Sequence, residues 1–120
     1  MNKNIRAIIA VKSTEMQDAL QALLESVKQI STIYQVRDEL AITELTTTYQ
    51  PTLVLVDFDL FDAISKHPET LLITLVDSRK EFDYVQSKGA KWVFMKGSPV
   101  SQLVLIIDSI LITNTLNGED

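Results

Sequence analysis

Asp57 is the residue best placed for chemistry, because it directly follows an unbroken apolar run. The stretch from Pro51 to Asp59 reads PTLVLVDFD, in which four branched aliphatic residues precede the carboxylate. Four such residues without alternation predict a strand covered on both faces, as in the middle of a parallel sheet. Open α/β sheets place their sites at the carboxyl ends of the strands. Asp57 is therefore the first candidate for function.

The other reactive residue types form no catalytic pattern. The chain has no cysteine, which excludes a disulfide framework, a thiolate metal site and a cysteine nucleophile. Its one histidine, His67, lies in KHPE beside a proline and is expected in an exposed loop. No Ser-His-acid set and no metal-ligand spacing occurs in the sequence. We therefore expect a protein that is not an enzyme and has no resident metal or other cofactor.

Composition indicates one globular domain spanning residues 1–120, with residues 114–120 as a flexible tail. The apolar content is 46% and the charged content 22%, which is ordinary for a protein with a hydrophobic core. Sixteen acidic and eleven basic residues give a net charge of −5 without any cluster of Lys or Arg. Direct binding to nucleic acid or to an anionic membrane has little support from this charge. We expect a cytoplasmic protein.

The elements that must position Asp57 alternate along the chain. Apolar runs predict five strands, at residues 5–11, 31–36, 53–57, 71–76 and 91–95. Helical spacing and capping residues predict helices between them, from a start at Thr14, over residues 38–48, from Ser78 to Gly89 and from Ser98 to about 113. Only ten residues, 60–69, join the third and fourth strands, so the third helix should be stunted, around residues 61–66. This alternation predicts βαβ units and a parallel sheet.

At this level the chain resembles the receiver domain of two-component response regulators. The resemblance is carried by PTLVLVD, by the apolar strand LLITLV, and by GAKWVFMK followed by a closing helix, and it covers essentially the whole chain. It implies an α/β, flavodoxin-like (βα)5 fold with a doubly wound, five-stranded parallel sheet of order 2-1-3-4-5. It also implies that Asp57 occupies the phosphoacceptor position and Lys96 the position of the lysine that binds the phosphoryl oxygens.

The sequence departs from the family pattern where a receiver binds Mg²⁺. The family places an acidic pair at the end of the first strand, and this chain has Val11 and Lys12 there. A metal would be left with Asp57 and a backbone carbonyl near Asp59, although Mg²⁺ prefers several oxygen ligands. A carboxylate that attacks a phosphoryl group needs such a cation. We therefore expect no metal-dependent phosphorylation.

The switch positions of the family are also altered. The hydroxyl residue that ends the fourth strand aligns with Val76, and the small residue after it aligns with Asp77. A phosphoryl group would lose a hydrogen-bond donor and meet a like charge. The aromatic residue of the fifth strand aligns with Val93.

Each residue of this candidate site has a plainer alternative. The Lys12 ammonium could replace the metal and pair with Asp57, or it could be a solvated lysine at a strand end. Asp57 could be a structural carboxylate that binds no phosphate. Lys96 could serve as its partner, or as the partner of Asp77, rather than as a phosphate ligand. Asp59 and Asp77 could be solvated loop acids at the rim of the site.

The last helix predicts a partner surface. Its apolar residues run almost all the way round, whereas a helix on the rim of a sheet needs one apolar stripe. We expect a homodimer through a face that includes Leu103, Leu105, Ile106 and Ile110, which the resemblance also favours. The alternative is that the stunted third helix or the tail covers the surplus.

Three hypotheses for function remain. The first, which we favour, is an atypical receiver domain that acts as a signal-transduction interaction module, with its output on a protein partner. The second is a phosphoacceptor response regulator modified on Asp57 in a phosphorelay, with Mg²⁺ bound. The third is an unrelated flavodoxin-like protein that binds a nucleotide or flavin, or an enzyme. The turn VKSTE after the first strand has no carboxylate for the second hypothesis before its final Glu15, and no glycine for the third.

Overall fold

Five strands and the helices between them follow one another along the chain. The computed structural model describes residues 5–48, 52–66 and 70–118. The strands are β1 (Ile5–Ala10), β2 (Ile30–Gln35), β3 (Thr52–Asp57), β4 (Leu71–Val76) and β5 (Trp92–Met95). The helices are α1 (Thr14–Glu25), α2 (Glu39–Thr48), the 3-10 turn η1 (Phe58–Leu60), α3 (Phe61–Ile64), α4 (Arg79–Ser87) and α5 (Val100–Gly118).

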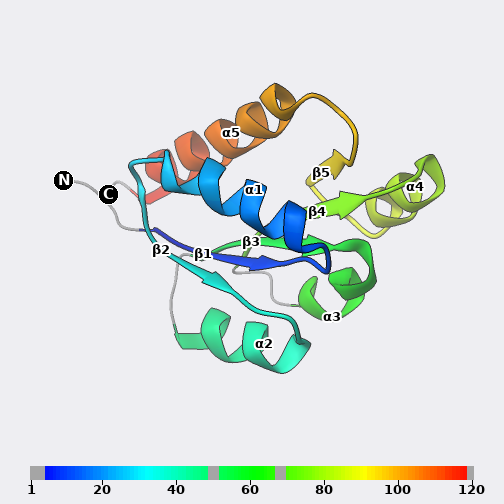
Figure 1. Ribbon diagram of the computed structural model, residues 1–120, viewed down its shortest axis with the longest axis horizontal. Helices are drawn as coiled ribbons and strands as arrows, with labels where there is room; N and C mark the ends of the chain where they lie inside the picture. The colour runs from blue at the N-terminus through cyan, green and yellow to red at the C-terminus, as the bar shows by residue number, and fades with distance from the viewer. Residues whose placement is uncertain (1–4, 49–51, 67–69, 119–120) are drawn as a thin grey trace.

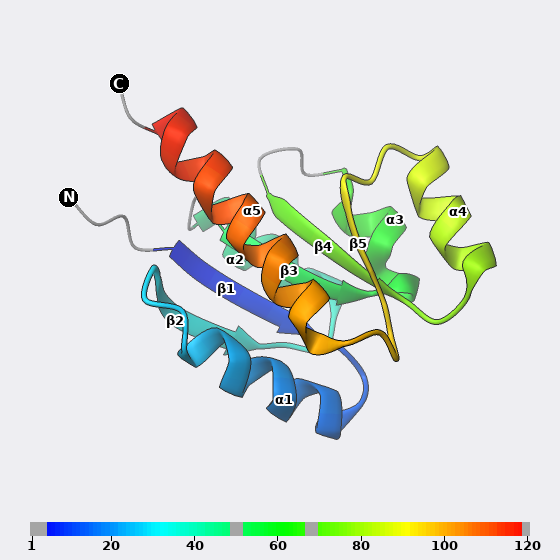
Figure 2. The same ribbon diagram turned by 90° about the horizontal axis from the view of Figure 1, so that it is seen from above.

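The strands form one parallel sheet in the order β2-β1-β3-β4-β5. Helices α1 and α5 cover one face, and α2, α3 and α4 lie on the other (Figure 1). Seen from above, α1 and α5 run side by side over the sheet (Figure 2). The predicted α/β, flavodoxin-like architecture and strand order are confirmed.

Strand β3 lies at the centre of the hydrophobic core. All four residues from Leu53 to Val56 are fully buried. Leu53 and Leu55 pack with residues of α1 and α5, while Val54 and Val56 pack with residues of α2 and α3. Burial of both faces explains why this strand shows no polar alternation, as predicted.

The third helix is short, as the ten-residue connection predicted. Helix α3 has four residues and continues directly from the 3-10 turn η1. It is anchored by Phe61 and Ile64, both buried. A helix of this length covers only part of the sheet beneath it.

Two helix boundaries differ from the sequence-based predictions. Helix α1 is capped by Ser13, whose Oγ accepts a hydrogen bond from the Met16 N–H at 3.2 Å, so the cap is one residue earlier than Thr14. Gln17 is buried and donates to the Val11 carbonyl at 2.7 Å instead of completing a capping box. Helix α5 continues to Gly118, because no proline or glycine interrupts it earlier, and so extends past the end predicted near residue 113. Residues 119–120, like His67, lie outside the described residues.

The described helices include none that is both long enough and apolar enough to cross a membrane.

Candidate functional site

Asp57 lies at the carboxyl end of β3 and is held at both carboxylate oxygens. It is buried, with 6% of the residue exposed. The Lys12 backbone N–H donates a hydrogen bond to Asp57 Oδ2 at 2.7 Å. The Lys96 ammonium lies 2.7 Å from Asp57 Oδ1. The carboxylate is therefore neutralised and oriented by groups of the same chain.

Lys96 reaches this position because its backbone is tied to the neighbouring strand. It follows β5 directly, and its N–H donates to the Val76 carbonyl at 2.8 Å. Its ammonium lies 3.6 Å from Asp77 Oδ2 as well as close to Asp57. Partial burial lowers the pKa of Lys96, but the hydrogen bonds and charges of Asp57 and Asp77 together outweigh burial and raise that pKa above 10.5. The ammonium bridges two carboxylates.

The Lys12 side chain does not pair with Asp57, so of the two alternatives for this residue the structure favours the exposed lysine at the end of a strand. The ammonium of Lys12 lies 2.6 Å from Asp59 Oδ2, on a side chain that is 81% exposed. Its hydrogen bond with Asp59 raises the pKa of Lys12. Only the main chain of Lys12 reaches Asp57. The strand before it fixes that N–H, because Val11 is buried and its carbonyl accepts from Gln17.

The donor set around Asp57 does not fit the Mg²⁺ ion that the resemblance implies. Asp57 and Asp59 each have a lysine ammonium within 2.7 Å. Among the described residues, no group of three or more His, Cys, Asp or Glu side chains is placed to hold a metal ion. Mg²⁺ requires several oxygen ligands in octahedral geometry. A cation here would have to displace an ammonium.

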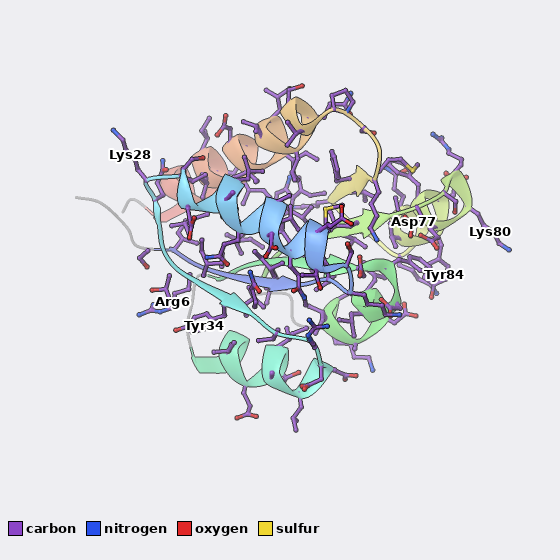
Figure 3. The ribbon with its side chains drawn as sticks, viewed as in Figure 1. Arg6, Lys28, Tyr34, Asp77, Lys80 and Tyr84 are labelled. Atoms are coloured by element: carbon purple, nitrogen blue, oxygen red, sulfur yellow. The ribbon has the colours of Figure 1, made fainter. Side chains whose placement is uncertain are left out.

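The altered switch positions are apolar contacts of the core. Val76 is fully buried at the end of β4, and Val93 is half-buried on β5. Both belong to a cluster with Val85 of α4. Asp77 is exposed beyond β4, at the start of the segment that leads into α4 (Figure 3). These residues position Lys96 and α4 but bring no hydroxyl to Asp57.

An aromatic contact beside the site was not predicted. The ring of Tyr84, on α4, meets the Phe58 ring edge-on at 5.6 Å and the Phe61 ring at 6.4 Å. Its hydroxyl donates to the Asp62 carboxylate, with distances of 3.0 and 3.1 Å to the two oxygens. That hydrogen bond raises the pKa of Tyr84. Because Phe58 follows Asp57, this contact joins the site segment to α4.

The predicted partner surface on α5 needs correction. Leu103 and Ile110 are 2% and 0% exposed and pack in the core, so they offer nothing to a partner. Leu105 is 64% exposed, and Ile106 is half-buried. Ile112, one heptad after Leu105, is 61% exposed and lies on the same side of the helix. The exposed stripe is therefore Leu105 and Ile112, flanked by Ile106.

The fold and the site define a flavodoxin-like α/β protein with a lysine-neutralised aspartate at the end of its central strand. No protein-family model, curated protein or solved structure matches the chain.

Proposed function

We propose that this protein is a receiver-like signalling module that works through protein contacts, without metal-dependent phosphorylation. The observation that carries the proposal is the coordination of Asp57. Both of its carboxylate oxygens are engaged, one by the Lys96 ammonium and one by the Lys12 N–H. The module is held in one state by its own groups.

The energetic reason is the cost of breaking a buried ion pair. Asp57 is almost fully buried, and the Lys96 side chain is 25% exposed. Removing one partner of such a pair costs about 3–5 kcal/mol, because the other charge stays buried and uncompensated. A metal ion at Asp57 has to displace the Lys96 ammonium and meet that cost before it gains any contact. With Lys12 in place of an acid, the site has little to offer in return.

One observation favours the alternative, a phosphoacceptor regulator in a two-component phosphorelay. The Lys96 ammonium is close enough to Asp57 to contact an oxygen of a phosphoryl group attached there. The same contact serves either function, so the lysine does not discriminate between them. The missing acidic ligands at Val11 and Lys12 count against the alternative.

In this proposal the output belongs to partner proteins in the cytoplasm. The stripe of Leu105 and Ile112 on α5 is the surface for a second copy of the chain, because exposed apolar side chains on one helix face mark interaction sites. The net charge of −5 argues against direct contact with nucleic acid or with anionic lipid. Leu105→Glu combined with Ile112→Glu should give a monomer in sedimentation equilibrium, at concentrations where the wild type is a dimer.

A phosphorylation assay tests the central part of the proposal. The protein is incubated with Mg²⁺ and acetyl phosphate, and its intact mass is measured over time, with Asp57→Asn as the control. We expect no gain of a phosphoryl mass in either protein. A phosphoryl adduct that forms on the wild type and is absent from Asp57→Asn would establish the phosphorelay alternative.

A further inference from the structure

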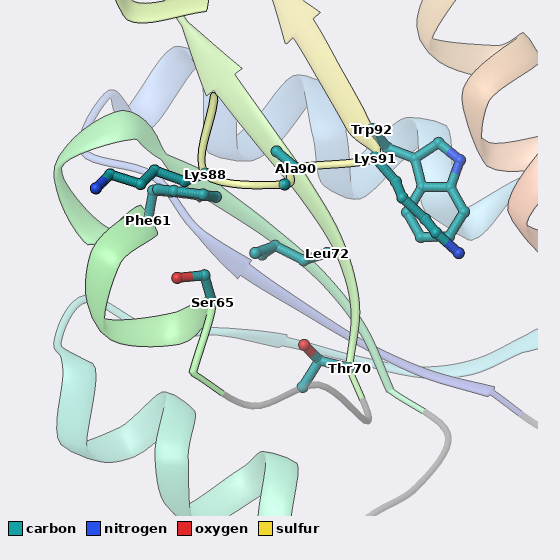
Figure 4. Close-up of a pocket in the computed structure, with 9 residues that line it drawn as sticks. Phe61, Ser65, Thr70, Leu72, Lys88, Ala90, Lys91 and Trp92 are labelled. Atoms are coloured by element: carbon teal, nitrogen blue, oxygen red, sulfur yellow. The ribbon is translucent and has the colours of Figure 1, made fainter. Parts of the chain in front are cut away.

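A hollow lies at the end of the sheet opposite Asp57. It has a volume of about 150 Å³ and is bounded by α3, by the start of β4 and by the turn between α4 and β5 (Figure 4). Leu72, near the start of β4, and Trp92, the first residue of β5, mark the amino ends of these strands. The lining residues are Phe61, Ser65, Thr70, Leu72, Lys88, Gly89, Ala90, Lys91 and Trp92.

The shortness of α3 explains why the hollow exists. The chain leaves β3 at the carboxyl end of the sheet, so α3 runs back toward the amino end, but it stops after four residues. Phe61 and Ile64 are its buried anchors, and Ser65, just beyond it, is exposed at the edge of the hollow. A longer helix would extend over this part of β4.

The walls of the hollow suit an apolar group. Phe61, Leu72 and Ala90 present carbon surface to it (Figure 4). The Ser65 hydroxyl is already engaged, because it donates to the Asp62 carbonyl at 3.2 Å. An apolar cavity of about 150 Å³ in another protein takes up a benzene-sized molecule. The hollow therefore has the size for one aromatic or large aliphatic side chain.

The charges around the hollow are positive. Lys88 and Lys91 are both exposed, and their side chains extend to opposite sides of it (Figure 4). Each ammonium lies 5.6 Å from the centre of an aromatic ring, Tyr84 for Lys88 and Trp92 for Lys91. None of the described residues that line the hollow is acidic. The charge beside the hollow is therefore positive, although the net charge of the chain is −5.

We infer that this hollow docks a partner protein through one aromatic or large apolar side chain with a carboxylate on either side of it in the partner's sequence. The apolar side chain enters the hollow that Phe61, Leu72 and Ala90 line, and the flanking carboxylates meet Lys88 and Lys91. Complementary charge on both sides sets the choice of partner, while burial of the anchor side chain supplies most of the affinity. The inference rests on the proposed function, since it names a partner surface for a module that signals through protein contacts.

Short capped peptides test this inference on the full chain. The amide resonances of ¹⁵N-labelled protein are followed during titration with acetyl-Glu-Phe-Glu-amide, and with acetyl-Lys-Phe-Lys-amide and acetyl-Glu-Ala-Glu-amide as matched probes. We expect the first peptide to shift Ser65, Leu72, Ala90 and the Trp92 indole with a Kd of about 1 mM. The other two should bind at least fivefold more weakly. Equal binding of the Lys and Glu peptides, shifts centred elsewhere, or no shifts up to about 10 mM would overturn the inference.

Matched variants separate the lysines of this hollow from the overall charge. Lys88→Gln with Lys91→Gln should weaken binding of the Glu-Phe-Glu peptide by about five- to tenfold, as expected for two exposed charge contacts. Lys28→Gln with Lys80→Gln changes the net charge equally at exposed lysines outside the hollow (Figure 3) and should leave binding unchanged. Equal weakening by both pairs would contradict a specific role for the hollow.

Two further variants separate this inference from the proposed function. Ser65→Leu places an apolar side chain at the edge of the hollow, from an exposed position, and should abolish the shifts. Asp57→Asn should bind the peptide as the wild type does, because Asp57 lies at the other end of the sheet. Binding that is lost in Asp57→Asn would contradict a separate surface. A phosphoryl adduct on Asp57 would refute the proposed function but leave the peptide result as it stands.

Discussion

The lysines at the two ends of the sheet differ in whether carboxylates of the same chain neutralise them. At the carboxyl end, the Lys96 ammonium lies within 4 Å of two carboxylates of the same chain. At the amino end, Lys88 and Lys91 lie beside aromatic rings next to an apolar hollow that no described acid lines. The first arrangement satisfies its charges internally, whereas the second leaves its cations exposed to solvent.

This difference indicates which end of the sheet can gain free energy by binding a partner. A charge that is already paired and buried loses a contact before it makes a new one. An exposed charge beside an apolar surface keeps its ability to meet a partner, at little cost in desolvation. The carboxyl end of the sheet, which holds Asp57, therefore has less to gain from binding than the amino end does.

Replacing Lys96 should have the largest effect on the carboxyl end. Lys96→Met leaves Asp57 buried without its cation, and the free energy of unfolding should fall by about 3 kcal/mol in urea denaturation. Lys91→Met, at the amino end, should change it by no more than about 0.5 kcal/mol. Equal effects of the two substitutions would abolish the contrast between the two ends. Adding Asp57→Asn to Lys96→Met should restore part of the loss, because the buried charge is removed as well.

Alkaline pH should weaken the same pair to a smaller extent. The folded protein raises the pKa of Lys96 above 10.5, so the folded state binds this proton more tightly than the unfolded chain does. The stabilisation is complete below about pH 10.5 and is lost as pH rises through the folded pKa. The groups that face this ammonium are Asp57, Asp77 and, through its charge, Lys12. Stability of the wild type should therefore fall toward that of Lys96→Met above this pH, and parallel pH profiles for the two proteins would argue against the pair.

Tyr84 lies between the two ends of the sheet and contacts residues from both. Its ring touches Phe58, next to Asp57, while the Lys88 ammonium lies over the same ring. Tyr84→Phe removes the hydrogen bond to Asp62 and should speed amide hydrogen exchange in α4, with less effect on global stability than Lys96→Met. Asp83→Asn, which breaks an exposed ion pair with Arg79 on the same helix, should leave that exchange rate unchanged. Slower or unchanged exchange in Tyr84→Phe would show that this contact does not hold α4.

Lys12→Ala should have the smallest effect. The ammonium is exposed and, within the part of the chain that the structure describes, pairs only with Asp59, while the N–H that binds Asp57 remains in alanine. We expect no measurable change in the urea midpoint. A large destabilisation would mean that the side chain, and not the main chain, supports Asp57.

The sequence predicted the fold, and the resemblance pointed to Asp57 and Lys96, which the structure brings into contact. The apolar run before Asp57 indicates a central strand because burial on both faces removes polar alternation. Lys96 follows the fifth strand, and parallel strands bring their carboxyl ends together, so the contact between these two residues is a consequence of topology. The short third helix follows from the length of its connection.

The features that could not be predicted depend on which way a main-chain or side-chain group points, and the residue pattern does not specify this. Whether the main chain or the side chain of Lys12 reaches Asp57 is decided by the turn after β1, for which the sequence gives no rule. On α5, nearly every position is apolar, so hydrophobicity alone does not separate buried Leu103 from exposed Leu105. The spacing of Leu103, Ile107 and Ile110 did contain that signal, because it follows a helical repeat. The hollow combines three separate segments and leaves no local signature.

The most direct test of the central claim is an NMR titration of Asp57 and its neighbours. The labelled protein is titrated with Mg²⁺ and then with beryllofluoride, a mimic of a phosphorylated carboxylate, with Asp57→Asn as the control. If the Lys96 ammonium and the Lys12 N–H close the site, the backbone amide resonances of Lys12, Lys96 and the residues around Asp57 should not shift specifically at millimolar metal. Saturable shifts at these residues that disappear in Asp57→Asn would contradict the account and establish a working phosphoacceptor.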